Sequence, residues 1–181
     1  TGAVGGAGAS CVPFDVAVIY ASAPGMGVVH AQARLSAAGR NEAQRRLALG
    51  EDPVDVLAYI GSTDFDNGYR ERQYLAADLA GRHATFTGNR TGAWSGGQSG
   101  IIDSITVAAA GNILTGPEVV EDTYVGFVGC DLADRLMNAL DAGRNRGGDA
   151  RCEPARPSDS AFIRVDLPGQ PGWLSLAVVD T

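Results

Sequence analysis

Short apolar runs broken by glycine and proline open the chain, and they predict strands. The runs cover residues 4–11, 15–21 and 27–33, and Pro24-Gly25 supplies a turn between the second and the third. Runs of this length, rich in valine, alanine and glycine and bounded by turn signals, are typical of strands. We therefore expect three strands in this first part of the chain.

The apolar spacing then lengthens to that of a helix. Residues 40–49 are rich in arginine and alanine and stop at Gly50, and a second helix is expected from Asp52 to Gly61. Asp52 is a good N-cap, Pro53 suits the first helical position, and Gly61 is a common stop. The sequence predicts a helical hairpin here.

The remaining chain repeats this order of strands and helices. Two antiparallel strands are predicted at residues 73–79 and 83–87, an exposed loop at residues 90–100 and a strand at residues 101–110. A helix is expected from Pro117 to about residue 128, and another after Asp131, where Leu132, Leu136 and Leu140 recur every fourth residue as far as Gly143. A polar loop over residues 144–159 precedes two final strands at residues 161–166 and 173–179.

The element order is strands, two helices, strands, two helices, strands. This order suits an α/β (α+β) fold in which two mainly antiparallel sheets face each other and helix pairs cover their outer faces. No internal repeat or linker is evident, so residues 1–181 are expected to form one domain.

Composition narrows the functions that this fold could perform. All 14 basic residues are arginine, against 21 acidic residues, for a net charge of −7. Without lysine, Schiff-base chemistry, a phosphate-loop lysine and a Ser-Lys dyad are excluded. The acidic balance argues against nucleic acid and against an anionic membrane surface. No nucleotide-binding motif or metal-ligand spacing is present, so no cofactor and no metal are expected.

Three cysteines, Cys11, Cys130 and Cys152, give an odd count. In a secreted protein they would form one pair and leave one thiol, and in a cytosolic protein they would be three thiols.

Eight segments, taken in order, resemble the blocks of the domain of unknown function 1028 family. Members of that family look like proteins of the N-terminal-nucleophile hydrolase fold, a four-layer αββα sandwich, so the resemblance implies that architecture and activity on amide bonds. The segments are Gly5 to Cys11, Gly27 to Ala33, Arg72-Gln73-Tyr74 with Thr87-Gly88, Gly111 to Leu114, Gly116 to Val119, Asp131 to Leu136, Gly148 to Cys152 and Ser160 to Val165.

One departure from the family pattern concerns the nucleophile. Family members usually begin with a strand whose first residue would attack the amide, and this chain begins at the turn after that strand. Residues 1–181 are therefore expected to be a domain that lacks the family's first strand. The resemblance also implies a disulfide between Cys130 and Cys152, as in secreted members.

Four residues are candidates for catalysis. Thr1 could use its own α-amine as base, or be a mere terminus. Ser10 ends the first strand and could orient a nucleophile or bind substrate, or be a small packing residue. His30 could be a general base or a hydrogen-bonded core residue. Asn112 could donate to an oxyanion or cap the next helix.

Two functions remain open at this stage. The leading hypothesis is a secreted or periplasmic hydrolase of amide bonds with unknown substrate. The alternative is a non-catalytic secreted module for binding or self-assembly, because loss of the first strand would leave a sheet edge that a partner strand or a second copy could fill. Asn89 begins a glycosylation sequon, which matters only in a eukaryotic source.

Overall fold

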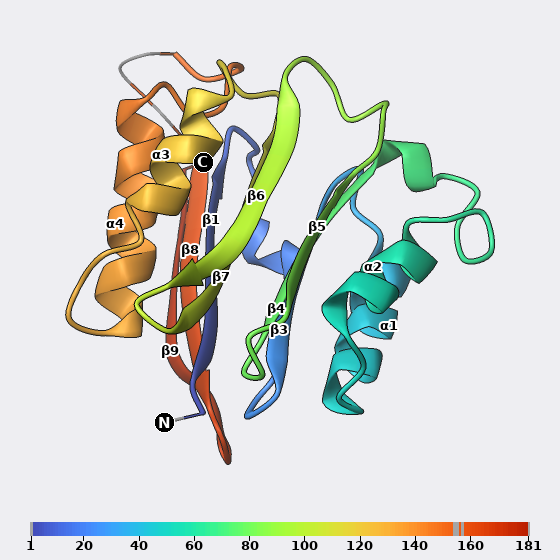
Figure 1. Cartoon of the computed structure of the whole chain (residues 1–181). Coiled ribbons are helices and arrows are strands. Elements are labelled where there is room, and N and C mark those ends of the chain that lie inside the picture. The colour runs from blue at the N-terminus through green and yellow to red at the C-terminus, as the bar shows by residue number, and fades with distance from the viewer. Residues whose placement is uncertain (1, 154–155, 157, 181) are drawn as a thin grey trace.

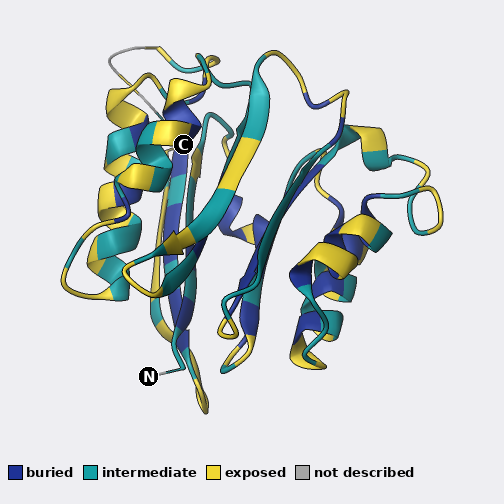
Figure 2. Ribbon diagram, viewed as in Figure 1, coloured by how far each residue is buried: buried dark blue, intermediate teal, exposed yellow. Residues whose placement is uncertain are grey.

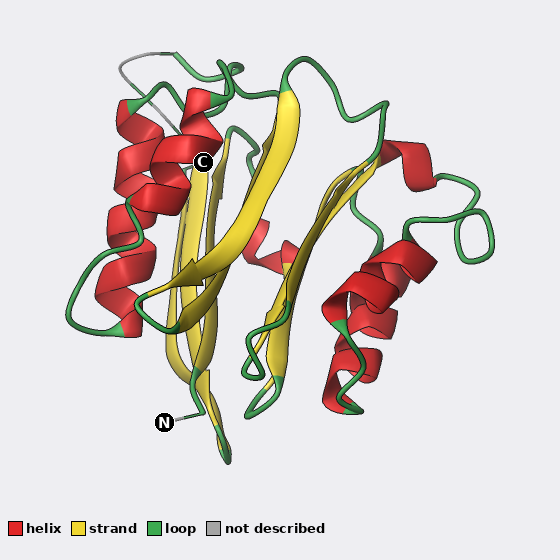
Figure 3. Ribbon diagram, in the orientation of Figure 1, coloured by secondary structure: helices red, strands yellow, loops and turns green. Residues whose placement is uncertain are grey.

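The α-helices stand on the two outer sides of the structure, and the strands lie between them (Figures 1 and 3). The computed structural model describes residues 2–153, 156 and 158–180. All strand pairs that it describes are antiparallel, in three sheets with the orders β1-β8-β9, β2-β3-β4-β5 and β6-β7. The mixed α/β class expected from the sequence is confirmed.

The strands are β1 Val4–Ser10, β2 Tyr20–Ala23, β3 Gly27–Ala33, β4 Arg72–Asp78, β5 His83–Thr87, β6 Ser95–Ile102, β7 Ile105–Asn112, β8 Ser160–Leu167 and β9 Gln170–Val179. The helices in the described part of the chain are α1 Ala37–Ala48, α2 Pro53–Ile60, α3 Glu118–Val125 and α4 Leu132–Asn145. None of them is long and apolar enough to cross a membrane.

The predicted helical hairpin forms and covers one face of the β2–β5 sheet. The carboxylate of Asp52 accepts a hydrogen bond from the Val54 N–H at 2.9 Å and begins α2 with Pro53 in its first turn. The apolar face of α2 packs with the fully buried Tyr74 of β4. Burying each large apolar side chain contributes about 1.5–3 kcal/mol, so this cluster holds α1 and α2 on the sheet.

The second helix pair, α3 and α4, lies against β1, β7 and β8 on the opposite side of the molecule (Figure 1). Leu132 and Leu136 of α4, two of the predicted leucines, pack against a buried cluster of Val107, Phe127 and Ala139. Dark buried positions are more frequent on α1 and α2 than on α3 and α4 (Figure 2).

A buried carboxylate joins the β1-β8-β9 sheet to the β2-β3-β4-β5 sheet at one edge. Asp166 of β8 accepts hydrogen bonds from the Tyr20 hydroxyl and the Ser22 hydroxyl of β2, both at 2.6 Å. Burial alone would raise the pKa of Asp166, but the hydrogen bonds outweigh it and lower the pKa. The sheets are thus joined by charge-assisted hydrogen bonds as well as by apolar packing.

The strand expected at residues 15–21 is wrong over most of its length. Asp15 accepts a hydrogen bond from the Ala17 N–H, and a short 3-10 turn follows at Val16–Ile19 before β2 begins. An aspartate that bonds to the backbone two residues ahead starts a turn instead of a strand.

The exposed loop expected at residues 90–100 is also wrong, because β6 occupies its second half. β6 and β7 form a hairpin around Asp103 and Ser104, whose φ values of 48° and 65° are those of a two-residue turn. Such turns usually contain glycine. The glycines lie in the strand itself, where Gly97 leaves room for Thr85 of the facing sheet.

Candidate functional site

Two strand edges without a partner border one cavity. Among the described strands, β1 pairs only with β8 and β7 pairs only with β6. The cavity has a volume of about 1480 Å³, and every residue of β1 and of β7 lines it. Its other walls come from α3 and α4 on one side and from β3 and β4 on the other. We call this cavity the slot.

The slot is large enough for one extended strand. β1 contains seven residues, which at about 3.3 Å per residue extend over roughly 23 Å. Dividing about 1480 Å³ by that length gives a cross-section of about 64 Å². One strand occupies about 48 Å², from a spacing of ~4.8 Å between strands and ~10 Å between stacked sheets.

The two edges run in the same direction. Ser10, at the end of β1, donates a hydrogen bond to Asp149, and Leu114, just after β7, forms a β-bridge with the same residue. Both carboxyl ends therefore meet at Asp149, which we call the Asp149 end of the slot. A strand that lies between β1 and β7 and runs opposite to both would form an antiparallel pair with each of them.

Small residues make this geometry possible. A Cβ on Gly6 would overlap the rings of His30 and Tyr20, and one on Gly5 would come within 3.1–3.2 Å of Leu136 and Leu132. The glycines of β1 therefore let it lie close to β3 on one side and to α4 on the other. Ala108 to Ala110 line the slot from β7.

His30 lies in the slot, halfway along β3. Its side chain is only 7% exposed, and its ring packs against the rings of Tyr20 and Phe162 with centroids 5.6 Å and 5.7 Å away. No described residue forms a hydrogen bond with either ring nitrogen. Burial lowers the pKa of His30 to about 4, so the imidazole is neutral at pH 7.

A charged cluster stands at the Asp149 end. The Asp149 side chain accepts hydrogen bonds from the backbone N–H of Cys11 at 3.2 Å and from the Arg151 Nε at 2.9 Å. The Arg151 guanidinium also donates to the Ser10 hydroxyl at 3.0 Å. Asp149 is buried and Arg151 is exposed, so the cluster presents positive charge to solvent.

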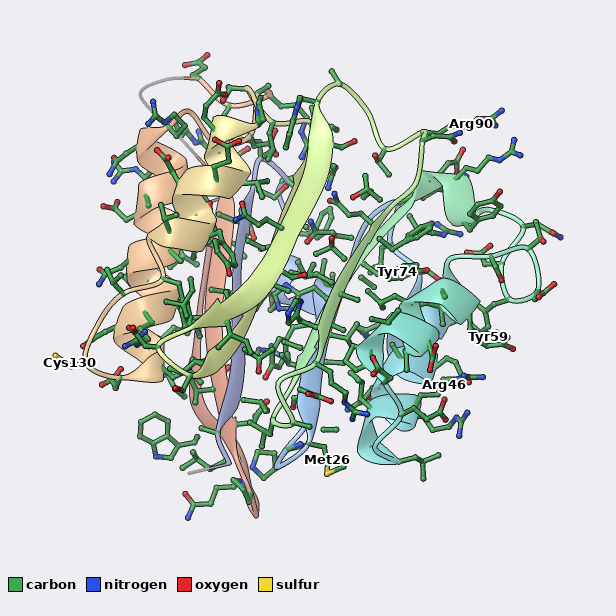
Figure 4. All side chains as sticks on the ribbon, viewed as in Figure 1. Met26, Arg46, Tyr59, Tyr74, Arg90 and Cys130 are labelled. Carbon is green, nitrogen blue, oxygen red and sulfur yellow. A yellow bond between two sulfur atoms is a disulfide. The ribbon has the colours of Figure 1, made fainter. Side chains whose placement is uncertain are left out.

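The disulfide joins Cys11 to Cys152, so the expected bond between Cys130 and Cys152 is wrong. Cys130 is a free, exposed cysteine before α4 (Figure 4). The cause is the length of α4, because fourteen residues separate its ends by roughly 21 Å. The loop after α4 instead returns to the end of β1, where Cys11 lies.

Asp149 should make stability depend on pH. Burial would raise its pKa, but hydrogen bonds from Arg151 and from the Arg151 and Cys11 backbone outweigh it and lower the pKa. A lowered folded-state pKa stabilises the fold above the unfolded value of about 3.9, and this contribution is lost as pH falls through the folded pKa. We expect the free energy of unfolding to fall less steeply below pH 4 in Asp149→Asn than in the wild type.

Urea unfolding at pH 2 to 6 measures this slope. Asp64→Asn removes an exposed carboxylate and is the matched control, which should keep the wild-type profile. Identical profiles for Asp149→Asn and the wild type would contradict the assigned hydrogen bonds.

A buried amide network holds the β6–β7 hairpin in place. Gln73 of β4 is 0% exposed. Its amide nitrogen donates to the Thr87 hydroxyl at 2.9 Å and to the carbonyls of Gly96 and Gly111 at 3.1 Å and 2.8 Å. Its oxygen accepts from Gln32 at 2.8 Å and from Asn112 at 3.3 Å. The network thus ties the end of β7 to β3 and β4 near the Asp149 end of the slot.

The predicted site residues lie along the slot without forming a catalytic pair. Ser10 bonds to Asp149 and Arg151, Asn112 bonds to Gln73, and His30 has ring contacts only. In the described part of the chain, no hydrogen bond joins His30 to Ser10 or to Asn112. Thr1 lies outside the described residues.

Sequence reasoning singled out Asn112 and Ser10 but missed their partners Gln73 and Arg151. Glutamine within an otherwise apolar strand, as at Gln73, was the available signal. Asp149, in Gly-Gly-Asp between Arg146 and Arg151, could be a site carboxylate or a turn residue on its sequence alone. No three His, Cys, Asp or Glu side chains of the described residues gather as metal ligands would.

Comparison with known proteins points to one family. A family model described as a family of unknown function, DUF1028, matches residues 1–180. A crystal structure of a protein from Silicibacter pomeroyi, which carries the same family model, is 27% identical and superposes with a TM-score of 0.81. The match covers 100% of this chain and 77% of that chain. No curated protein matches the sequence.

Proposed function

The chain belongs to DUF1028, a family of unknown function, and from the slot in its structure we propose that this member binds an extended peptide strand between β1 and β7. The observation that carries the proposal is the pair of unpaired edges facing one cavity. Strand addition to an open edge is a common mode of peptide recognition, with main-chain hydrogen bonds supplying affinity. Here a strand gains such bonds on both sides.

The bound strand runs antiparallel to both edges, with its N-terminal end at Asp149. Its side chains then alternate between the face of α4 and the face of β3. The α4 face is apolar, formed by Leu132, Leu136 and their neighbours. Aliphatic side chains therefore suit the positions that point toward α4, and small side chains suit the positions that point toward β3.

Peptide binding tests the proposal. The probe is acetyl-Ser-Val-Ala-Val-Ser-Val-Ala-amide with a C-terminal fluorescent label, equal in length to β1. The control replaces the central valine by proline, which lacks an N–H and fits a central strand poorly. We expect saturable binding of the probe by fluorescence anisotropy and at least about tenfold weaker binding of the control.

A slot-filling variant locates the binding. Ala108→Phe adds a phenyl ring to a residue that lines the slot, and Ala38→Phe adds the same ring to an exposed residue of α1. We expect Ala108→Phe to weaken binding of the probe on the order of tenfold or more. Ala38→Phe should leave the affinity for the probe unchanged. Equal binding of probe and proline control, or equal effects of the two variants, would refute the proposal.

Hydrolysis of amides is a second candidate, favoured by the polar groups at the Asp149 end. A strand in the slot would place its first residue beside Ser10 and Asn112. With a strand between β1 and β7, the sheets and helix pairs would also match the four-layer sandwich of N-terminal-nucleophile hydrolases. A threonine in first position would attack the amide carbonyl, its α-amine would pass the proton to the leaving amine, and water would release the acyl group.

A probe with a free N-terminal threonine separates the two functions. Hydrolysis predicts release of nitroaniline from acyl-nitroanilide substrates only when protein and threonine probe are both present. The acetylated probe should bind without activity. Proteasome-type sites support the threonine with lysine, which this chain lacks. Arginine, charged below a pH of about 12, cannot accept the proton instead.

The disulfide supports a location outside the cytoplasm. Disulfides persist in oxidising compartments, and Cys11–Cys152 fastens the loop that forms the Asp149 end. We therefore propose that the protein acts in a secreted or periplasmic setting.

A further inference from the structure

His30 points an unsatisfied polar side chain into the slot. The side chain is 93% buried, by its 7% exposure, and lines the cavity from β3. Its Nε2 atom contacts the side of Gly6 where a Cβ would stand. A neutral imidazole has one donor and one acceptor, and no described residue satisfies either. Neither ring nitrogen is among the fully enclosed side-chain atoms that lack a partner, so both are accessible from the slot, where a bound group can supply the partner.

The register of a bound strand shows where that partner would come from. In an antiparallel pair, directly opposite residues point to the same face, with Cβ atoms about 4.5–5.5 Å apart. The residue opposite Gly6 therefore points toward β3, beside the ring of His30. No side chain of β1 competes for this space, because Gly6 has none.

The chemistry of the surroundings selects a hydroxyl. The rings of Tyr20 and Phe162 pack against the ring of His30, and the Tyr20 hydroxyl already donates a hydrogen bond to Asp166. A carboxylate or ammonium group would enter this apolar site unpaired and at high cost. A hydroxyl is small and neutral, and it can donate or accept according to the tautomer of the imidazole.

We infer that His30 is a specificity-determining residue, which selects a serine or threonine at the strand position opposite Gly6 by a hydrogen bond to its hydroxyl. This inference rests on the proposed strand binding and adds the chemistry of the strand. The serine hydroxyl bonds to His30, while the aliphatic residues on either side of it point toward α4. Strands with alanine or valine at that position would leave the imidazole unsatisfied.

Two peptides that differ at one atom test the inference. In the seven-residue probe the fifth residue lies opposite Gly6, and it is serine or alanine. Because removing one partner of a buried hydrogen bond typically weakens binding about tenfold, the serine probe should bind about ten times more tightly than the alanine probe. In His30→Leu the two probes should bind equally, and in His30→Gln, whose amide can donate and accept, the preference should return in part.

His83→Leu is the matched control, because His83 lies on β5 outside the slot and bonds to Ser99. It should keep the tenfold preference. A measurement on the wild type avoids any folding defect of the variants. Long-range ¹H–¹⁵N spectra of the His30 ring should show a shift of one ring nitrogen with the serine probe and none with the alanine probe.

The outcomes separate the two proposals. Equal affinity of both probes for the wild type, with no ring shift, would overturn the role of His30 while strand binding stands. Failure of both probes to bind would refute the proposed strand binding and, with it, the proposed role of His30. A preference for serine that survives in His30→Leu would assign the selectivity to another residue and also overturn the inference.

Discussion

Replacing Gln73 by leucine should destabilise the fold by more than about 3 kcal/mol. The side chain is fully buried and contacts five polar partners on β3, β5, β6 and β7. Leucine fills a similar volume but makes none of these bonds. The carbonyls of Gly96 and Gly111 would each lose a donor, and leaving a buried polar group unsatisfied costs about 1–3 kcal/mol.

Urea or thermal unfolding measures the effect, with Gln98→Leu as the matched control. Gln98 lies on β6, in the hairpin that the network holds, but its side chain is exposed. The same substitution there should change stability by no more than about 0.5 kcal/mol. Similar losses in both variants would show that the amide network contributes nothing specific.

Removal of the disulfide should cost up to about 5 kcal/mol. Cys11 and Cys152 are 141 positions apart, and in the chain-entropy model a loop of about 100 residues is already worth about 4.7 kcal/mol. The double variant Cys11→Ser/Cys152→Ser should therefore unfold at lower temperature and lower urea concentration than the wild type. The loss should concentrate around the Asp149 end, where the bond fastens the loop after α4 to β1.

Cys130→Ser is the control for this prediction. The thiol of Cys130 is free and exposed, so its replacement should leave the midpoint unchanged. Reducing agent should lower the midpoint of the wild type and of Cys130→Ser alike. An unchanged midpoint on reduction would mean that the bond does not form.

Local signals in the sequence predicted most elements, because their causes are local. The bounds of β3 and β5 agree with the expectation, and α2 begins at Pro53 after its Asp52 cap as predicted. The β6–β7 hairpin was missed because its turn, Asp103-Ser104, carries no glycine, and the strand before it carries three. Gly97 makes room for Thr85 of the facing sheet and Gly100 makes room for Tyr124 of α3, which no local pattern reveals.

The candidate site could be predicted only in part, because it depends on contacts between distant segments. His30 and Ser10 were singled out by residue type, yet the structure gives them separate surroundings. Asp149 and Arg151 meet Ser10 across more than a hundred positions of chain. The pairing of Cys152 followed from the path of the loop after α4, and a count of three cysteines left it open.

The composition of the two slot edges has a consequence for solubility. Exposed edges in natural sheets are usually guarded against aggregation by lysine, proline or inward-pointing charge. Neither β1 nor β7 contains any charged residue or proline. Here the surrounding fold protects the edges instead. Each edge lies inside the slot, between a helix pair and a facing sheet, where a flat sheet of another molecule cannot dock. These walls thus keep the edges of other sheets away from β1 and β7.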